Sequence, residues 1–161
     1  MCGSTFRTKI GGQSMIDRMK DFYMTLANNC ANMSRAVRLK VGAIIVKNEN
    51  ILSFSWNGTP RGWDNRCEDE FLNEDGSVVL KTKPEVLHAE RNALDKLARS
   101  HESGEGATLF TTHAPCIECA KSIYGVGITE VYYTNEYRSV DGIEFLKKCG
   151  IKVEQITTKH E

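Results

Sequence analysis

The second half of this sequence alternates three times between a helical pattern and a strand pattern. The helical stretches, each followed by its strand, are residues 85–100 and 107–112, 116–124 and 128–134, and 140–149 and 151–157. Such alternation is typical of parallel strands joined by right-handed helical crossovers. Upstream, residues 40–46 and 51–56 have the pattern of a β-hairpin, and a helical pattern begins at Ser14.

Together these elements predict an α/β fold, a three-layer α/β/α sandwich with a mixed five-stranded sheet and helices on both faces. We expect a single domain over residues 14–161, preceded by a polar, flexible tail at residues 1–13. Residues 57–84 are rich in Gly, Asn, Asp and Glu. We expect an irregular functional or mobile loop there, with at most a short helix.

Charge and cysteine content narrow the function classes. The 161 residues carry 21 basic and 21 acidic side chains, whereas nucleic-acid binders usually show a basic excess. A small-molecule partner is therefore favoured over nucleic acid. No run approaches the roughly 18 apolar residues of a membrane span, and the N-terminus lacks the apolar core of a signal peptide. We expect a cytoplasmic protein, whose closely spaced cysteines are metal ligands or catalytic groups rather than disulfides.

Three residues have the types and spacing of zinc ligands. Cys116 and Cys119 lie at the start of a predicted helix, where the helix N-terminus favours thiolates, and His88 lies near the start of another. Three ligands leave a fourth position for water, as in catalytic zinc sites, whereas structural sites usually have four protein ligands. Glu90 is placed to accept a proton from that water, whose pKa zinc lowers toward about 7.

His-x-Glu followed by Pro-Cys-x-x-Cys is the signature of zinc deaminases. Each half alone has other readings, because Cys-x-x-Cys also occurs in redox sites and zinc knuckles. The 24 residues between Glu90 and Pro115 hold the rest of a helix and one strand. They bring both helix starts to the end of the sheet where open α/β folds bind ligands. We find no partners for a second metal at Cys67, and expect surface positions for His101 and His113.

With these motifs the sequence resembles the cytidine-deaminase superfamily and, within it, the deoxycytidylate (dCMP) deaminases. The resemblance covers roughly residues 14–157, and its four stretches are residues 34–46, 57–62, 88–93 and 115–121 with 128–137. The long insertion and its Asn-Gly-x-Pro start are similar to dCMP deaminases in particular. Ile117 departs from the Pro-Cys-Gly-x-Cys usual in free-cytidine deaminases, and tRNA adenosine deaminases usually lack so long an insertion.

The resemblance implies hydrolytic deamination of dCMP to dUMP and ammonia, with Zn²⁺ as cofactor and Glu90 as the catalytic proton carrier. It also implies that Asn57 binds the deoxyribose hydroxyl and that the backbone of Ala89 contacts the pyrimidine edge. Tyr137 and Arg138 would line the nucleotide site, although an exposed loop pair is an alternative reading. Arg35 and Arg38 are candidate phosphate contacts, since arginine suits phosphate oxygens, or else belong to a solvated helix end.

Members of this family are typically homo-oligomers, often hexamers, and many are activated by dCTP and inhibited by dTTP, with Mg²⁺ on the triphosphate. We expect such an effector near the loop at residues 61–70, including Arg61, and near the helix end at Arg99. Three alternatives stay open. The chain could be another deaminase acting on tRNA adenosine, free cytidine or guanine, a non-catalytic nucleotide-binding zinc protein, or a zinc-stabilised interaction module.

Overall fold

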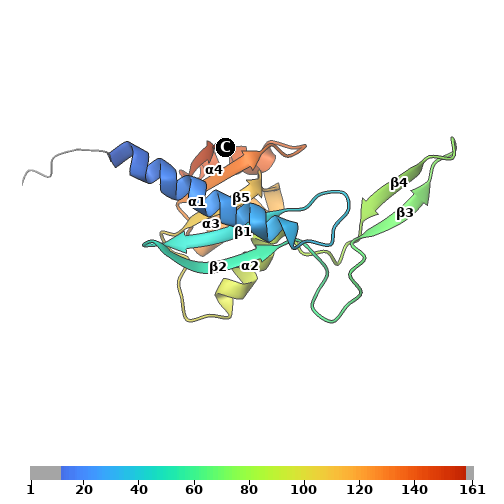
Figure 1. Cartoon of the computed structure of the whole chain (residues 1–161), viewed down its shortest axis with the longest axis horizontal. Helices are drawn as coiled ribbons and strands as arrows, with labels where there is room; N and C mark the ends of the chain where they lie inside the picture. The colour runs from blue at the N-terminus through green and yellow to red at the C-terminus, as the bar shows by residue number, and fades with distance from the viewer. Residues whose placement is uncertain (1–11, 159–161) are drawn as a thin grey trace, which may run out of the picture.

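The computed structural model describes the backbone of residues 12–158 and the side chains from residue 17 onward (Figure 1). In chain order the elements are α1 (Gly12–Asn32), β1 (Gly42–Lys47), β2 (Asn50–Trp56), β3 (Glu68–Leu72), β4 (Val78–Thr82), α2 (Ala89–Ala98), β5 (Thr108–His113), α3 (Ile117–Val126), β6 (Glu130–Asn135), α4 (Asp141–Lys148) and β7 (Lys152–Gln155). No helix among the described residues is long and apolar enough to cross a bilayer.

Five strands form the central sheet in the order β2-β1-β5-β6-β7. Strand β1 is antiparallel to both β2 and β5, whereas β5, β6 and β7 are parallel. The antiparallel pair β1–β2 is the predicted hairpin, β1–β5 is a second antiparallel pair, and the two parallel pairs come from the crossovers through α3 and α4. The prediction of a mixed five-stranded sheet is therefore confirmed.

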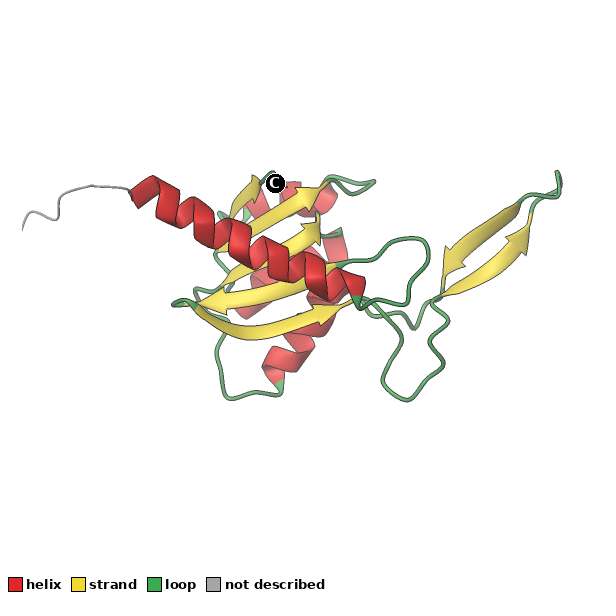
Figure 2. Cartoon of the chain, in the orientation of Figure 1, coloured by secondary structure: helices red, strands yellow, loops and turns green. Residues whose placement is uncertain are grey.

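Strand β1 shows why the sheet has helices on both faces. Ala43 and Ile45 belong to the apolar cluster that includes α2, α3 and α4. Ile44 and Val46 pack instead with Tyr23, Met24 and Ala27 of α1. Because side chains alternate along a strand, one buried strand supplies both cores. Figure 2 shows α1 crossing the face opposite the other helices, which completes the predicted three-layer sandwich.

Helix α1 approaches the sheet closely at Gly42, the first residue of β1. A Cβ at this position would overlap the carbonyl oxygen of Ala27 and the backbone nitrogen of Ala31. Glycine therefore allows the backbones of helix and strand to meet here. This contact anchors the chain just before the strand that leads past the candidate site.

Three features differ from the sequence prediction. The stretch expected to be irregular contains the hairpin β3–β4, a separate two-stranded sheet that projects from the body (Figure 1). Helix α2 begins at Ala89 rather than at residue 85, because Leu87 is held extended by a β-bridge to Gly58. Helix α1 already begins at Gly12, and residues 1–11 of the expected tail lie outside the described residues.

Candidate metal centre and active site

Two helix starts bring the predicted metal ligands together. His88 is the N-cap of α2 and has an extended backbone, with φ −68° and ψ 149°. Cys116 is the N-cap of α3, with φ −69° and ψ 167°, and Cys119 lies in the first turn of that helix. The Gly58–Leu87 bridge holds the chain directly before His88, with hydrogen bonds of 2.8 and 3.1 Å. Local backbone structure thus aims all three side chains at one point.

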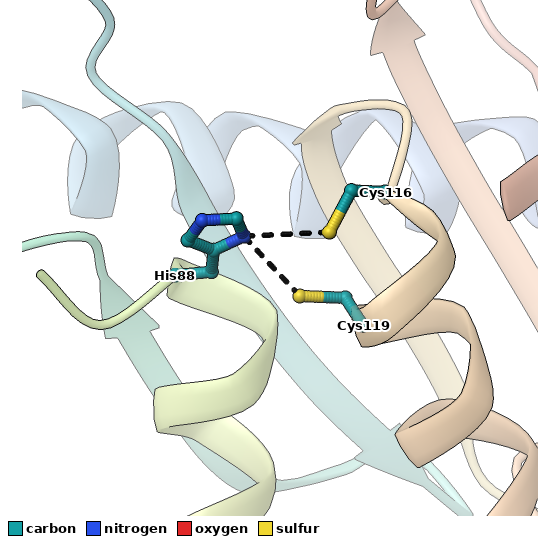
Figure 3. Close-up of side chains that lie close together, drawn as sticks. All are labelled: His88, Cys116 and Cys119. Carbon is teal, nitrogen blue, oxygen red and sulfur yellow. Dashed lines mark hydrogen bonds between the residues drawn. The ribbon is translucent and has the colours of Figure 1, made fainter. Parts of the chain in front are cut away.

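The ligand atoms have the spacing of a tetrahedral zinc site (Figure 3). Nδ1 of His88 lies 3.5 Å from the sulfur atoms of both Cys116 and Cys119. Zinc with tetrahedral geometry, Zn–S of about 2.3 Å and Zn–N of about 2.05 Å, separates such atoms by about 3.6 Å. All three ligand atoms lie within 4.8 Å of one another. One nitrogen and two sulfur donors therefore fit zinc and leave a fourth coordination position.

One of the two cysteines at this site already has the thiolate form that binds metals. A hydrogen bond from Cys119 lowers the pKa of Cys116 to about 3. The same bond raises the pKa of Cys119, which is the donor. The hydrogen bond with Cys116 raises the pKa of His88, and the positive charge of Arg138 opposes this shift. A thiolate is the form of cysteine that coordinates metals, and Cys116 supplies one.

Glu90 lies in the first turn of α2, two residues after His88, and is only 4% exposed. Burial raises the pKa of its carboxyl group to about 7. The hydroxyl group of Thr111, on β5, lies 3.5 Å from Oε1 of Glu90. Few buried carboxyl groups lack a charged partner unless they serve a function. Glu90 therefore has the placement of a proton-transfer group.

A cavity of about 590 Å³ opens over these residues. This volume is within the usual range for small-molecule sites. The predicted site residues that line the cavity are Arg38, Asn57, His88, Ala89, Glu90, Cys116, Tyr137 and Arg138. Cys119 is buried behind them. Arg35, Arg61 and Arg99 are exposed and are not part of the cavity wall.

The side chain of Asn57 organises one wall of the cavity. Its Oδ1 accepts a hydrogen bond from the backbone N–H of Val41 at 2.9 Å, and its Nδ2 donates to the carbonyl of Leu39 at 2.8 Å. The hydroxyl of Ser34 donates to the carbonyl of Asn57 at 2.8 Å. An amide can donate two hydrogen bonds and accept two, so Asn57 can also contact a ligand.

The predicted pair after β6 forms part of the wall. The guanidinium of Arg138 lies 5.5 Å from the ring centroid of Tyr137, within the range of a cation–π contact. Both residues line the cavity. Their place in the cavity wall favours the reading as site residues over that of an exposed loop pair, although Arg138 is itself exposed.

Besides Glu136, which follows β6, sequence reasoning missed four polar residues of the cavity wall: Glu68, Lys81, Thr82 and His113. His113 was expected at the surface, but it ends β5, is half-buried, and its Nδ1 lies 3.0 Å from the Thr112 hydroxyl. The other three come from the hairpin that was expected to be irregular. Their one signal in the sequence is that residues 81 and 82 closely precede His88.

Cys67 has a packing environment rather than a metal environment. It is 1% exposed and packs with Ala36 and Val86 in a small apolar cluster. Within residues 12–158, the one group of three or more His, Cys, Asp or Glu side chains with metal-binding spacing is His88, Cys116 and Cys119.

Comparison with known proteins supports the same chemistry. Residues 17–135 match the family described as the cytidine and deoxycytidylate deaminase zinc-binding region. The fold is similar to the crystal structure of a dCMP deaminase from the cyanophage S-TIM5, in complex with dCMP and dUMP. The two chains are 49% identical with a TM-score of 0.77, and the match covers 86% of this chain and 97% of that chain.

Curated relatives agree over most of this chain. A deoxycytidylate deaminase from Saccharomyces cerevisiae is 34% identical over 148 residues, which are 87% of this chain and 45% of the relative. The ComE operon protein 2 of Bacillus subtilis is 32% identical over 137 residues, covering 84% of this chain and 69% of the relative. The chain thus spans less than half of the yeast protein. It belongs to the family of cytidine and deoxycytidylate deaminases that carry this zinc-binding region.

Proposed function

We propose that the protein catalyses the hydrolytic deamination of dCMP to dUMP and ammonia. The observation that carries this proposal is the position of Glu90, buried beside the His88, Cys116 and Cys119 cluster at the base of a nucleotide-sized cavity. The cyanophage dCMP deaminase, solved with dCMP and dUMP, shares 49% of its sequence with this chain and matches it over nearly its whole length. This similarity supports the same reaction for this chain.

His88, Cys116 and Cys119 would hold Zn²⁺, which when bound supplies Lewis-acid chemistry and lowers the pKa of water toward about 7. Glu90 accepts the proton that water loses as its oxygen bonds to C4 of cytosine. Glu90 delivers this proton to N3, then takes the remaining proton from the new C4 hydroxyl group and passes it to the amino group, which leaves as ammonia. The new C4 oxygen becomes the carbonyl of uracil, so atoms and charge balance.

The remaining wall residues would bind and orient the nucleotide. We assign the deoxyribose hydroxyl to the amide of Asn57 and the pyrimidine edge to the backbone of Ala89. Tyr137 and Arg138 border the nucleotide on the side of β6, and Arg38 is a phosphate contact, since all of them line the cavity. Arg35 is exposed and does not line the cavity, so we place the phosphate beside Arg38 instead.

A substrate panel tests the proposal. Ammonia release would be measured with dCMP, deoxycytidine, cytosine, guanine and tRNA, using zinc-loaded protein. We expect dCMP to be turned over with the highest kcat/KM. Faster turnover of any other compound, or no turnover of dCMP, would overturn the substrate assignment.

Regulation and assembly form a second level of the proposal, supported by the family resemblance. We expect a cytoplasmic single-domain protein over residues 14–161 that assembles as a homo-oligomer, with a hexamer favoured. Apolar side chains exposed on the β3–β4 hairpin support a contact with another copy. They are Phe71, Leu72, Val78 and Val79. Repeating the dCMP assay with dCTP or dTTP and Mg²⁺ tests for an effector site near Arg61 and Arg99. A rate that neither nucleotide changes would rule out this regulation.

A further inference from the structure

The β3–β4 hairpin contributes directly to the substrate cavity although it projects from the body of the protein. Glu68 begins β3, and Lys81 and Thr82 end β4, so all three lie where the hairpin joins the body (Figure 1). All three line the same cavity as Glu90. The hairpin is thus part of the site rather than an appendage.

Glu68 ties this hairpin to the chain segment that carries Arg38. Its side chain is 7% exposed, and Oε1 accepts hydrogen bonds from the backbone N–H groups of Val37 at 3.0 Å and Arg38 at 3.1 Å. The guanidinium of Arg38 donates to the hydroxyl of Thr82 at 3.2 Å. Backbone and side chain of Arg38 are therefore both fixed by the hairpin.

Lys81 places a second positive charge on this wall. Its Nζ lies 4.7 Å from the ring centroid of Phe71, a cation–π contact that does not neutralise the ammonium. The residue opposite Lys81 across the strands is Asp69. The carboxylate of Asp69 lies 3.9 Å from Nζ of Lys83, so Asp69 is engaged by a different lysine. In the part of the chain that the structure describes, no carboxylate forms an ion pair with Lys81, so its charge is available to a ligand.

The reaction itself sets the direction in which a nucleotide must lie. The amino-bearing base has to reach Glu90, so the phosphate lies elsewhere along the cavity wall. Arg38, Lys81 and Arg138 are the basic residues of that wall. Of its acidic residues, Glu90 serves the base and Glu68 is held by two backbone N–H groups, whereas Glu136 is exposed on the opposite loop.

We infer that the β3–β4 hairpin completes the phosphate end of the nucleotide site, with Lys81 contacting the phosphate and Glu68 positioning Arg38 beside it. This inference rests on the proposed function. The hairpin thereby selects phosphorylated substrates over free nucleosides. Lys81 is a binding residue in this scheme, and Glu68 acts through Arg38.

Ligand affinity in a non-reacting background tests the role of Lys81. In a Glu90→Gln parent, calorimetry would give the Kd of dCMP and of deoxycytidine. We expect Lys81→Met to raise the Kd of dCMP roughly tenfold or more, because a charge-assisted hydrogen bond contributes a free energy of that size. Deoxycytidine should bind unchanged, and Lys81→Arg should keep most of the dCMP affinity. Lys148→Met, an exposed lysine of α4 outside the cavity wall, is the control for net charge.

A double-mutant cycle tests the role of Glu68. Glu68→Ala should weaken the binding of dCMP about as much as Arg38→Met does. The double variant should lose little more dCMP affinity than either single variant. Glu68→Gln keeps an acceptor oxygen and should restore binding. Additive losses, or equal losses for dCMP and deoxycytidine, would show that Glu68 has only a structural role.

Different results would overturn the proposed function and the role of the β3–β4 hairpin. If the wild-type protein turns over dCMP and Lys81→Met binds dCMP as tightly as its parent, only the hairpin inference is wrong. If the wild-type protein does not turn over dCMP, the proposed function fails and the inference falls with it.

Discussion

Gly142, in the first turn of α4, packs against the backbone carbonyl of Pro115, the residue directly before Cys116. A Cβ at position 142 would overlap that oxygen and the backbone of Cys116. Helix α4 therefore supports the ligand loop from behind, and only glycine allows so close an approach. The metal centre depends in this way on a residue far from it in sequence.

Replacing this glycine should disturb the metal centre. We expect Gly142→Ala to reduce the free energy of unfolding by about 1–3 kcal/mol, as overpacking does, and to weaken zinc binding through the shift of Cys116. Chemical denaturation and a zinc-chelator competition would measure the two effects. Gly125→Ala in α3 is the control, because a Cβ there meets nothing within 4 Å and alanine favours helix. Unchanged zinc affinity in Gly142→Ala would contradict this account.

The three proposed ligands should be needed for metal retention. Cys119→Ser should reduce bound zinc from about one ion per chain to a small fraction, because a serine hydroxyl is a far weaker zinc ligand than a thiolate. Metal content would be measured by atomic emission after dialysis. Cys149→Ser, at the end of α4, should keep its zinc. Equal zinc content in the two variants would argue against Cys119 as a ligand.

Asn57 should matter for both stability and substrate binding. Asn57→Ala removes the hydrogen bonds to Leu39 and Val41, and we expect a loss of about 1–3 kcal/mol in the free energy of unfolding. The KM for dCMP should rise as well, since the same segment lines the cavity. Thermal unfolding and steady-state kinetics would separate these effects. A variant with lower stability and an unchanged KM would limit Asn57 to a structural role.

The exposed apolar pair on the hairpin offers a test of assembly. Leu72 and Val78 are cross-strand partners, with 78% and 57% of their surfaces exposed. If they contact a second copy, changing both to serine should shift the protein to a smaller assembly in light scattering. Val140→Ser, at a similarly exposed apolar position before α4, serves as the comparison. An assembly of unchanged mass would exclude the pair from the interface.

The sheet could be predicted because its strands are buried and therefore patterned. Strand β1 is apolar along nearly its whole length, as expected for a strand buried between two layers of helices. The helices on either side of β6 are each followed by a glycine, the usual signal of a helix end. The β3–β4 hairpin could not be predicted in this way. Strand β3 has one buried residue, Glu68, and the rest of both strands is exposed or half-buried, so no alternation marks it.

The site residues also fall into two groups, those that a sequence motif marks and those that only the fold brings into the site. His88, Glu90 and the cysteines are visible in sequence because the metal and its proton carrier require fixed types at fixed spacing. Lys81 and Glu68 join the site through the fold of the hairpin, and their spacing has no such requirement. The early helix start expected at residue 85 failed for a related reason, since a bridge between Gly58 and Leu87 overrides local helix propensity.

In the proposed reaction Glu90, beside a zinc held by His88, Cys116 and Cys119, carries the protons of dCMP deamination. Ammonia release from dCMP by the zinc-loaded wild type and by Glu90→Gln, each with its zinc content measured, tests this most directly. We predict that Glu90→Gln keeps its zinc and loses at least about 10²-fold in kcat. A zinc-loaded Glu90→Gln variant that releases ammonia at the wild-type rate would contradict the account.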